Sequence, residues 1–189
     1  MKIASFSLLA VLGLCLPVFG QAPFQPGDLK VGKVEVGTPT TPEYQTKSGD
    51  LKRYKLGKWI EMELSYDTKK AVDELTFKYT VQIEGKLYDG EVTYASIAEG
   101  RDHYAVMYVS PKAIDGLLKG KPLTTAVIDN VWVDVSKSGQ KMAQTVSMPG
   151  KPDKMPNLPH IQGIVLNKDE TPFAPLYYDR YEAIKNTRR

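Results

Sequence analysis

The stretch Leu75-Thr76-Phe77-Lys78-Tyr79-Thr80-Val81-Gln82-Ile83 decides the fold class of this chain. Large apolar side chains occupy every second position, and polar side chains occupy the positions between them. Successive side chains point to opposite faces of a β-strand, so this spacing gathers the apolar groups on one face, whereas an α-helix would scatter them. The stretch therefore predicts a half-buried β-strand.

The same alternation recurs along the chain. In residues 58–66, apolar side chains share one parity, while Trp59, Glu61 and Glu63 share the other. Similar patterns, separated by turn residues, predict further strands over 31–36, 86–97, 103–109, 126–135, 141–148 and 161–166. We expect antiparallel neighbours, an interruption at Asp89-Gly90, and a hairpin turn at Ser138-Gly139.

Two segments favour helix. Ser110-Pro111 is typical of a helix start, Ala113, Ile114, Leu117 and Leu118 follow at helical spacing, and Gly120 provides a stop. After Pro175, the spacing of Leu176, Tyr177, Tyr181 and Ile184 fits a helical face, although Tyr177, Tyr178 and Tyr181 also fit a strand. We therefore expect one short connecting helix, and of the two readings of the tail we favour a C-terminal helix.

The number and spacing of these strands determine the expected architecture. About seven or eight short strands with regular turn signals predict a mainly β, antiparallel sandwich of two sheets, ahead of a barrel. The region 21–57 is rich in proline and glycine and predicts a leading edge strand and a long loop. Residues 58–189 form the sandwich body and its tail, so 21–189 is expected to be one domain.

The N-terminus predicts export. Lys2 precedes an apolar run from Ile3 to Phe19, and Gly20 supplies the small residue that signal peptidase needs. We expect residues 1–20 to be a signal peptide cleaved near Gly20, which places the product in the periplasm, at the cell surface or outside the cell. A retained anchor is the alternative, but a run of this length broken by Pro17 is at the lower limit for spanning a bilayer. No membrane span is expected in the mature chain.

Composition excludes several classes of site. Cys15 is the only cysteine and lies within the apolar run, so the mature chain has no disulfide, thiolate metal site or cysteine nucleophile. Removing residues 1–20 takes away one lysine and leaves 24 basic and 22 acidic residues. That balance argues against a nucleic-acid surface.

No motif for catalysis or cofactor binding is present. The two histidines, His103 and His160, lack partner motifs, and no nucleophile elbow, glycine-rich loop or pair of metal-spaced histidines occurs. Glu61 and Glu63 would point the same way from one strand at a spacing that a glycosidase could use, but alternating glutamates are also ordinary on a solvated strand. The turn 167–171 lacks the spacing of a calcium loop. We expect no catalytic residue, no metal and no cofactor.

The candidate binding residues are aromatic. Trp59 and Trp132 share the polar parity of their strands, which predicts that both indoles point away from the main core. They could form a surface patch, or be covered by loops or turned inward by a bulge, and cover is the more usual state of tryptophan. The tail adds Tyr177, Tyr178, Arg180 and Tyr181 as a docking segment, or as a cover over an open end of the sandwich.

Taken together, the apolar N-terminus, Lys58-Trp59-Ile60-Glu61-Met62-Glu63-Leu64, Val131-Trp132-Val133-Asp134-Val135 and the tail from Pro172 to Ile184 carry a resemblance. The chain resembles a family of small secreted proteins with an immunoglobulin-like fold from mucin-degrading gut Verrucomicrobia, encoded among type IV pilus genes. The resemblance implies an immunoglobulin-like sandwich and a pilus-associated or host-contact role, and it carries over no catalytic residues. The mature chain departs from antibody domains because it has no cysteine.

These observations predict a secreted, non-enzymatic β-sandwich that binds an envelope, pilus or host protein. Because its apolar N-terminal run is expected to be removed, the chain is predicted to be an accessory component and not a main pilin subunit. A carbohydrate-binding module that uses Trp59, Trp132 and tyrosines is the second hypothesis. A glycoside hydrolase that uses Glu61 and Glu63 is the third.

Overall fold

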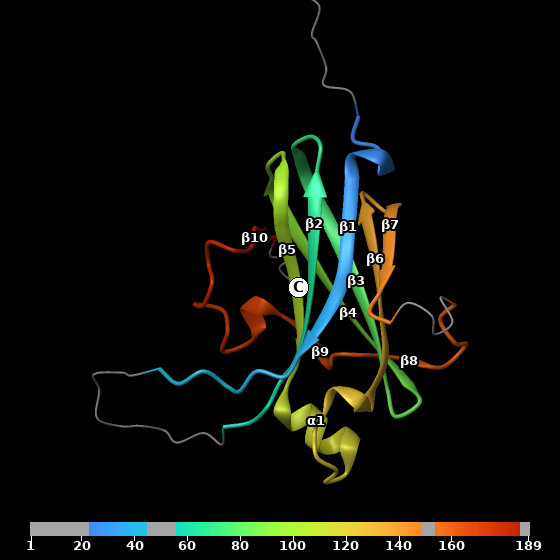
Figure 1. The fold of residues 1–189 in the computed structure, drawn as a ribbon, viewed down its shortest axis with the longest axis vertical. Helices are drawn as coiled ribbons and strands as arrows, with labels where there is room; N and C mark the ends of the chain where they lie inside the picture. Colours follow the sequence, from blue (N-terminus) through green and yellow to red (C-terminus); the bar gives the residue numbers. More distant parts are fainter. Residues whose placement is uncertain (1–22, 45–55, 149–153, 186–189) are drawn as a thin grey trace, which may run out of the picture.

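A computed structural model describes residues 23–44, 56–148 and 154–185. Two β-sheets pack face to face as a sandwich, with a short helix at one end (Figure 1). Sheet A has the strand order β1 (Leu29–Gly37), β2 (Ile60–Thr68), β5 (Gly100–Val109) and β9 (Val165–Asn167). Sheet B has the order β10 (Ala183–Ile184), β4 (Lys86–Ile97), β3 (Val72–Ile83), β6 (Ile128–Lys137) and β7 (Gln140–Val146), and β8 (His160–Gln162) also pairs with β4. The predicted sandwich is confirmed.

The main core lies between the two sheets. The five apolar side chains that define the alternating stretch of β3 are at most 1% exposed, and all belong to this core. Met62, Leu64 and Tyr66 of β2 enter the same core from sheet A. The polar residues of both strands lie on the outer faces, so the period-two pattern fixed which side of each sheet is buried.

Two core tyrosines of sheet B reach across to the backbone of β5. The Tyr79 hydroxyl donates to the carbonyl oxygen of Ala105 at 2.9 Å, and the Tyr94 hydroxyl accepts from the N–H of Val106 at 3.1 Å. Burial raises the pKa of both phenols well above the usual range, so both stay protonated. These bonds satisfy buried backbone groups of β5 and tie the two sheets together.

Gly90 marks a close contact between the sheets and not a break in a strand. The predicted interruption at Asp89-Gly90 is wrong, because β4 pairs with β3 continuously through both residues. A Cβ at Gly90 would lie 2.6 Å from Val165 and 2.7 Å from Met107, so only glycine allows β9 to pack this closely. The glycine in the strand pattern therefore reflects a close contact between the two sheets and not an interruption of β4.

The short connecting helix is confirmed as α1 (Pro111–Leu118). Ser110 is its N-cap, with Oγ accepting from the N–H of Ala113 at 3.3 Å, and Ile114 and Leu118 are buried on its inner side. The predicted β6–β7 hairpin is also present, with Ser138 and Gly139 both in the left-handed region that such a tight turn requires.

The chain after β7 differs from expectation. The predicted strand 161–166 is two short strands, because Gly163, with a φ of +86°, separates β8 from β9 and the strands join different sheets. β8 also pairs parallel to β4 and not antiparallel. The favoured C-terminal helix is wrong: residues 171–180 form turns and bends, Tyr181 forms an isolated parallel bridge with Tyr104, and the two-residue strand β10 follows.

The C-terminal segment, defined as residues 160–185, closes one side of the sandwich (Figure 1). β8 pairs with β4, β9 with β5, and β10 again with β4, so the segment passes from sheet B to sheet A and back. On the opposite side, Thr145 Oγ1 of β7 donates to the carbonyl oxygen of Gly32 on β1 at 2.9 Å. Both open sides of the sandwich are therefore bridged.

The predicted signal peptide, residues 1–20, lies outside the described residues. Within the described ranges, no helix has the length and apolar character that a membrane crossing requires.

Candidate binding surface

A second apolar cluster lies on the outer face of sheet A, beneath the C-terminal segment. Its buried members are Trp59, Val106, Tyr108 and Phe173, which come from the residue before β2, from β5 and from the C-terminal segment. Phe173 stacks on Tyr108 with ring centroids 4.7 Å apart and planes 6° apart, and it meets the Trp59 ring edge-on at 5.5 Å. This cluster, called the outer cluster below, fixes the C-terminal segment to the sheet.

Trp59 belongs to the outer cluster and is only 6% exposed. Its Nε1–H donates to Thr41 Oγ1 at 2.9 Å, so the buried indole is hydrogen-bonded. The parity prediction is confirmed in that the indole faces away from the main core. The surface-patch interpretation of Trp59 is wrong, because the C-terminal segment covers the ring.

Trp132 lies on the outer face of sheet B and is 2% exposed. Thr80 of β3 is opposite Trp132 in register on one side and opposite Asp89 of β4 on the other, so the three residues form a buried row across the sheet. Neither tryptophan therefore offers a free face to a ligand. Covered indoles, the more usual state, are what the structure contains.

Polar contacts hold the middle of the C-terminal segment against β2. Arg180 binds Glu63 with both arms of its guanidinium group, Nε to Oε1 at 3.0 Å and Nη2 to Oε2 at 2.6 Å. The Tyr181 hydroxyl donates to Glu63 Oε1 at 2.5 Å. The Arg180 guanidinium also lies 3.6 Å above the centre of the Tyr104 ring. Bidentate pairing with stacking fixes direction as well as distance, so this part of the segment has a defined orientation.

The two carboxylates considered for glycoside hydrolysis are both occupied. Glu63 accepts from Arg180 and Tyr181, as described above. Burial raises the pKa of Glu61, and the nearby charge of Glu63 adds to this shift, while a hydrogen bond from the Tyr108 hydroxyl opposes it. A raised pKa is a property that general acids share, but here the carboxyl lies against the outer cluster and its partner is held in an ion pair.

Two tyrosines stand out from this surface. Tyr177 is 64% exposed and Tyr178 is 82% exposed, and no other described large apolar side chain is more than 44% exposed. They lie in a turn in which the N–H of Arg180 donates to the carbonyl oxygen of Tyr177 at 3.1 Å. Tyr177 has a φ of +53°, a left-handed conformation that is uncommon for an aromatic residue. Residues 177–179 are called the tyrosine turn below.

The base of the tyrosine turn is fixed on both sides. The N–H of Leu176 donates to the carbonyl oxygen of Phe173, which is buried in the outer cluster, and Arg180 binds Glu63 immediately after the turn. The Tyr44 hydroxyl, from the loop before β2, donates to the carbonyl oxygen of Pro172 at 2.5 Å. A strained backbone conformation persists only where the surrounding structure fixes it, and these contacts fix the left-handed conformation of Tyr177.

Both histidines attach the C-terminal segment to the body of the sandwich. His103 Nδ1 lies 3.0 Å from Glu182 Oε1, and the His103 ring stacks on Tyr66. His160 Nδ1 lies 2.9 Å from Asp89 Oδ2. Burial alone would raise the pKa of Asp89, but bonds from Thr80 and His160 and the charge of Lys78 hold it below the usual range. His103 Nε2 also lies 3.5 Å from Thr68 Oγ1, so a carboxylate, an imidazole and a hydroxyl lie in sequence at this position. Thr68 is only 4% exposed and its hydroxyl donates to the carbonyl oxygen of Ala98 at 2.7 Å, so this hydroxyl is not an accessible nucleophile.

The described residues hold no group of three or more side chains suited to a metal ion. In the turn considered for calcium, Asn167 Oδ1 accepts from the N–H of Asp169 at 3.0 Å, and Glu170 Oε2 accepts from the N–H of Asn167 at 2.9 Å. These oxygens cap the short helix η3 (Lys168–Glu170) and are used within the turn.

The structure separates the six candidate binding residues into three groups. Tyr177 and Tyr178 are exposed together, Arg180 and Tyr181 support them through Glu63, and Trp59 and Trp132 are buried. Phe173 was not among the candidate binding residues predicted from the sequence, and neither was the contact of Glu63 with the tail. Glu63 lies 117 residues before Arg180, and no local pattern links the two.

Comparison with known proteins agrees with this fold. A crystal structure of a protein from Akkermansia muciniphila matches with a TM-score of 0.72 and 24% sequence identity, over 84% of this chain and 93% of that chain. At that identity the likeness concerns the fold alone, and the organism is one of the mucin-degrading Verrucomicrobia to which the sequence resemblance pointed. No curated protein matches. One protein-family model matches residues 20–188, which is nearly the whole chain, and the chain belongs to that family.

Proposed function

We propose that this chain is a secreted, non-enzymatic β-sandwich that binds another protein at the cell envelope or outside the cell, as an accessory component associated with a pilus. The observation that supports binding most directly is the tyrosine turn. It presents two adjacent, strongly exposed aromatic rings on a base fixed by the outer cluster and by the Arg180–Glu63 pair. Tyrosine is enriched where protein interfaces concentrate their binding energy.

Pre-organisation is the physical reason for favouring a binding role. A loop that must be ordered on association loses conformational entropy, and this loss reduces the affinity. Here the backbone of the tyrosine turn is already held at Leu176 and Arg180, so association would restrict little beyond the two phenol rings. Aromatic rings with few rotatable bonds are suited to such a contact.

The non-enzymatic part of the proposal rests on how the polar groups are used. Glu61 and Glu63 lie beneath the C-terminal segment and are engaged by Tyr108, Arg180 and Tyr181. A glycosidase needs both carboxyl groups open to a sugar ring and to water. The export and pilus parts rest on the N-terminal sequence and on the resemblance described above.

The experiment is crosslinking on intact source cells, followed by affinity capture and mass spectrometry. It compares the wild-type protein with a variant that carries Tyr177→Ser and Tyr178→Ser, and with a control that carries Lys86→Ser and Glu91→Ser at two exposed positions of β4. We expect envelope or pilus components with the wild type and the control, and their loss with the tyrosine variant. Equal recovery from all three proteins would remove the tyrosine turn from the proposal.

Carbohydrate binding is the second candidate, and the adjacent exposed phenol rings are the observation that favours it, since aromatic faces can stack on sugars. Because both tryptophans are covered, the module would have to use Tyr177 and Tyr178. A glycan array probed with the wild type and with the Tyr177→Ser, Tyr178→Ser variant tests this. Binding that the variant loses would favour the glycan, and an array without signal would leave protein binding.

A further inference from the structure

A groove opens at the end of the sandwich that carries α1. It has a volume of about 500 Å³, within the range of pockets that bind small molecules. Its apolar lining comes from Leu56 before β2, from Pro111 and Ile114 of α1, and from Pro122 and Leu123 after the helix. Leu56 is 44% exposed, more than any other described large apolar side chain outside the tyrosine turn.

Lysines surround this apolar lining. Lys58, Lys112 and Lys121 line the groove together with a single acidic residue, Asp115. Lys121 forms an exposed ion pair with Glu84 at 2.9 Å. Lys58 and Lys112 form no salt bridge within the described part of the chain. The groove therefore combines an apolar floor with a positively charged rim.

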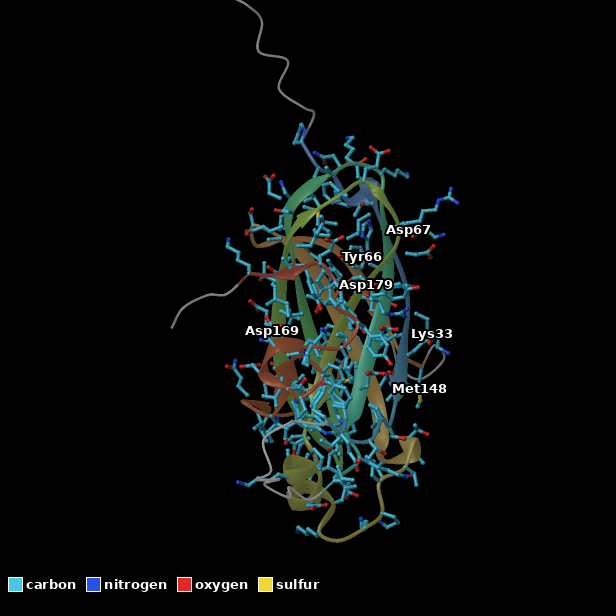
Figure 2. The ribbon with its side chains drawn as sticks, turned by 90° about the vertical axis from the view of Figure 1, so that its left-hand side faces the viewer. Lys33, Tyr66, Asp67, Met148, Asp169 and Asp179 are labelled. Carbon is cyan, nitrogen blue, oxygen red and sulfur yellow. The ribbon has the colours of Figure 1, made fainter. Side chains whose placement is uncertain are left out.

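The tyrosine turn has the complementary chemistry. It offers two exposed rings followed by Asp179, an exposed carboxylate, and Asp169 is exposed on the same side of the molecule (Figure 2). A phenol ring fits an apolar floor with its hydroxyl toward a polar rim, and the carboxylate fits the lysines. The projecting tyrosine turn therefore fits the groove in shape, and the negative charge of Asp179 fits the positive charge of the lysines.

We propose that the tyrosine turn of one molecule seats in the α1 groove of a second copy of this chain, with Asp179 facing Lys58 and Lys112. This inference rests on the proposed function, since it names the partner of the same turn. Arg180 holds the turn over Glu63, and Lys58 lies five residues earlier in extended chain, roughly 16 Å away along the strand. The turn and the groove of one molecule therefore lie apart, and each would be filled by a neighbour.

The contact joins two different patches, so it is heterologous. Each molecule would keep a free turn at one end and a free groove at the other, and assembly would continue until the chain of molecules closes or ends. One turn in one groove makes a small interface, so the association is weak and becomes visible only at high concentration. Its charged part is exposed and weakens as the salt concentration rises.

Sedimentation velocity over a concentration series that reaches millimolar tests the proposal. Three variants accompany the wild type: the turn variant (Tyr177→Ser, Tyr178→Ser), the groove variant (Lys58→Glu, Lys112→Glu) and a control with the same charge change elsewhere (Lys33→Glu, Lys86→Glu). All the altered side chains are exposed, and circular dichroism checks that each variant is folded. The decisive sample is the equimolar mixture of turn and groove variants, because it retains one intact turn and one intact groove.

We expect the wild type and the control to grow in mass beyond a dimer, each single variant to remain monomeric, and the mixture to stop at a dimer. A wild type that stays monomeric at every concentration would overturn the proposal, as would a mixture that stays monomeric or a single variant that assembles like the wild type. If the self-association is absent but the crosslinking experiment still recovers a different protein through Tyr177 and Tyr178, the proposed function stands and only the identity of the partner is wrong.

Discussion

Replacing Phe173 with alanine should release the C-terminal segment from sheet A. Phe173 is 5% exposed and forms ring contacts with Trp59 and Tyr108. Truncation of a buried phenylalanine costs about 3–5 kcal/mol in the free energy of unfolding, which is less than the about 5–15 kcal/mol of a typical domain. Phe173→Leu keeps most of the volume and loses the two ring pairings, which together are worth about 1–3 kcal/mol. The two losses should therefore rank in that order.

Urea unfolding measures the stability loss, and iodide quenching of tryptophan fluorescence reports the cover over Trp59. We expect quenching to rise in folded Phe173→Ala, since the ring that meets Trp59 edge-on is gone, while Trp132 stays buried on sheet B. Phe24→Ala is the matched control, because Phe24 is 8% exposed in the main core and does not touch the outer cluster. If Phe173→Ala costs less than about 1 kcal/mol and leaves quenching unchanged, the outer cluster does not hold the segment.

Three further predictions concern single side chains. Glu61→Gln should stabilise the protein at neutral pH. Burial raises the pKa of Glu61, so ionisation of this carboxyl destabilises the folded state as the pH rises through the raised pKa. The urea midpoints of the variant and the wild type should converge below about pH 4, where the carboxyl is protonated in both the folded and the unfolded state. In Arg180→Lys the lysine cannot pair with both oxygens of Glu63. Because the ion pair is partly exposed, we expect the free energy of unfolding in urea to fall by about 1 kcal/mol or less. An unchanged urea midpoint would show that the ion pair orients the C-terminal segment without stabilising the fold. Gly90→Ala should cost about 1–3 kcal/mol by calorimetry, and Val165→Ala in the same chain should recover part of it, whereas an unaffected Tm would contradict the close contact.

The strands were predictable because their information is local. The five alternating apolar residues of β3 all lie on the buried face of the sheet, and the alternation alone indicates this without knowledge of any tertiary contact. The same holds for the start of α1, where Ser110 and Pro111 carry the capping chemistry in adjacent positions. The parity of Trp59 and Trp132 likewise gave the correct face of each sheet.

Parity does not reveal what covers a face, and here the tail was misjudged. Leu176 packs on the outer cluster, Ile184 packs on the main core, and Tyr181 contacts both, so their spacing reflects two surfaces and not one helical face. The contact that orients the tail joins Arg180 to Glu63 across 117 residues. Such pairings depend on topology, which a single sequence does not display.

Residues 160–185 pair with both sheets, and this also sets an order for folding. Synthesis delivers the chain from its N-terminus, so β4 and β5 emerge while β8, β9 and β10, which complete their outer edges, are still to come. Until the last strand is synthesised, the neighbouring edges of both sheets remain unpaired and Trp59 remains exposed to solvent. The native state is therefore reached only after the final thirty or so residues are released, and a stop codon before His160 would leave an unsealed sandwich prone to aggregation.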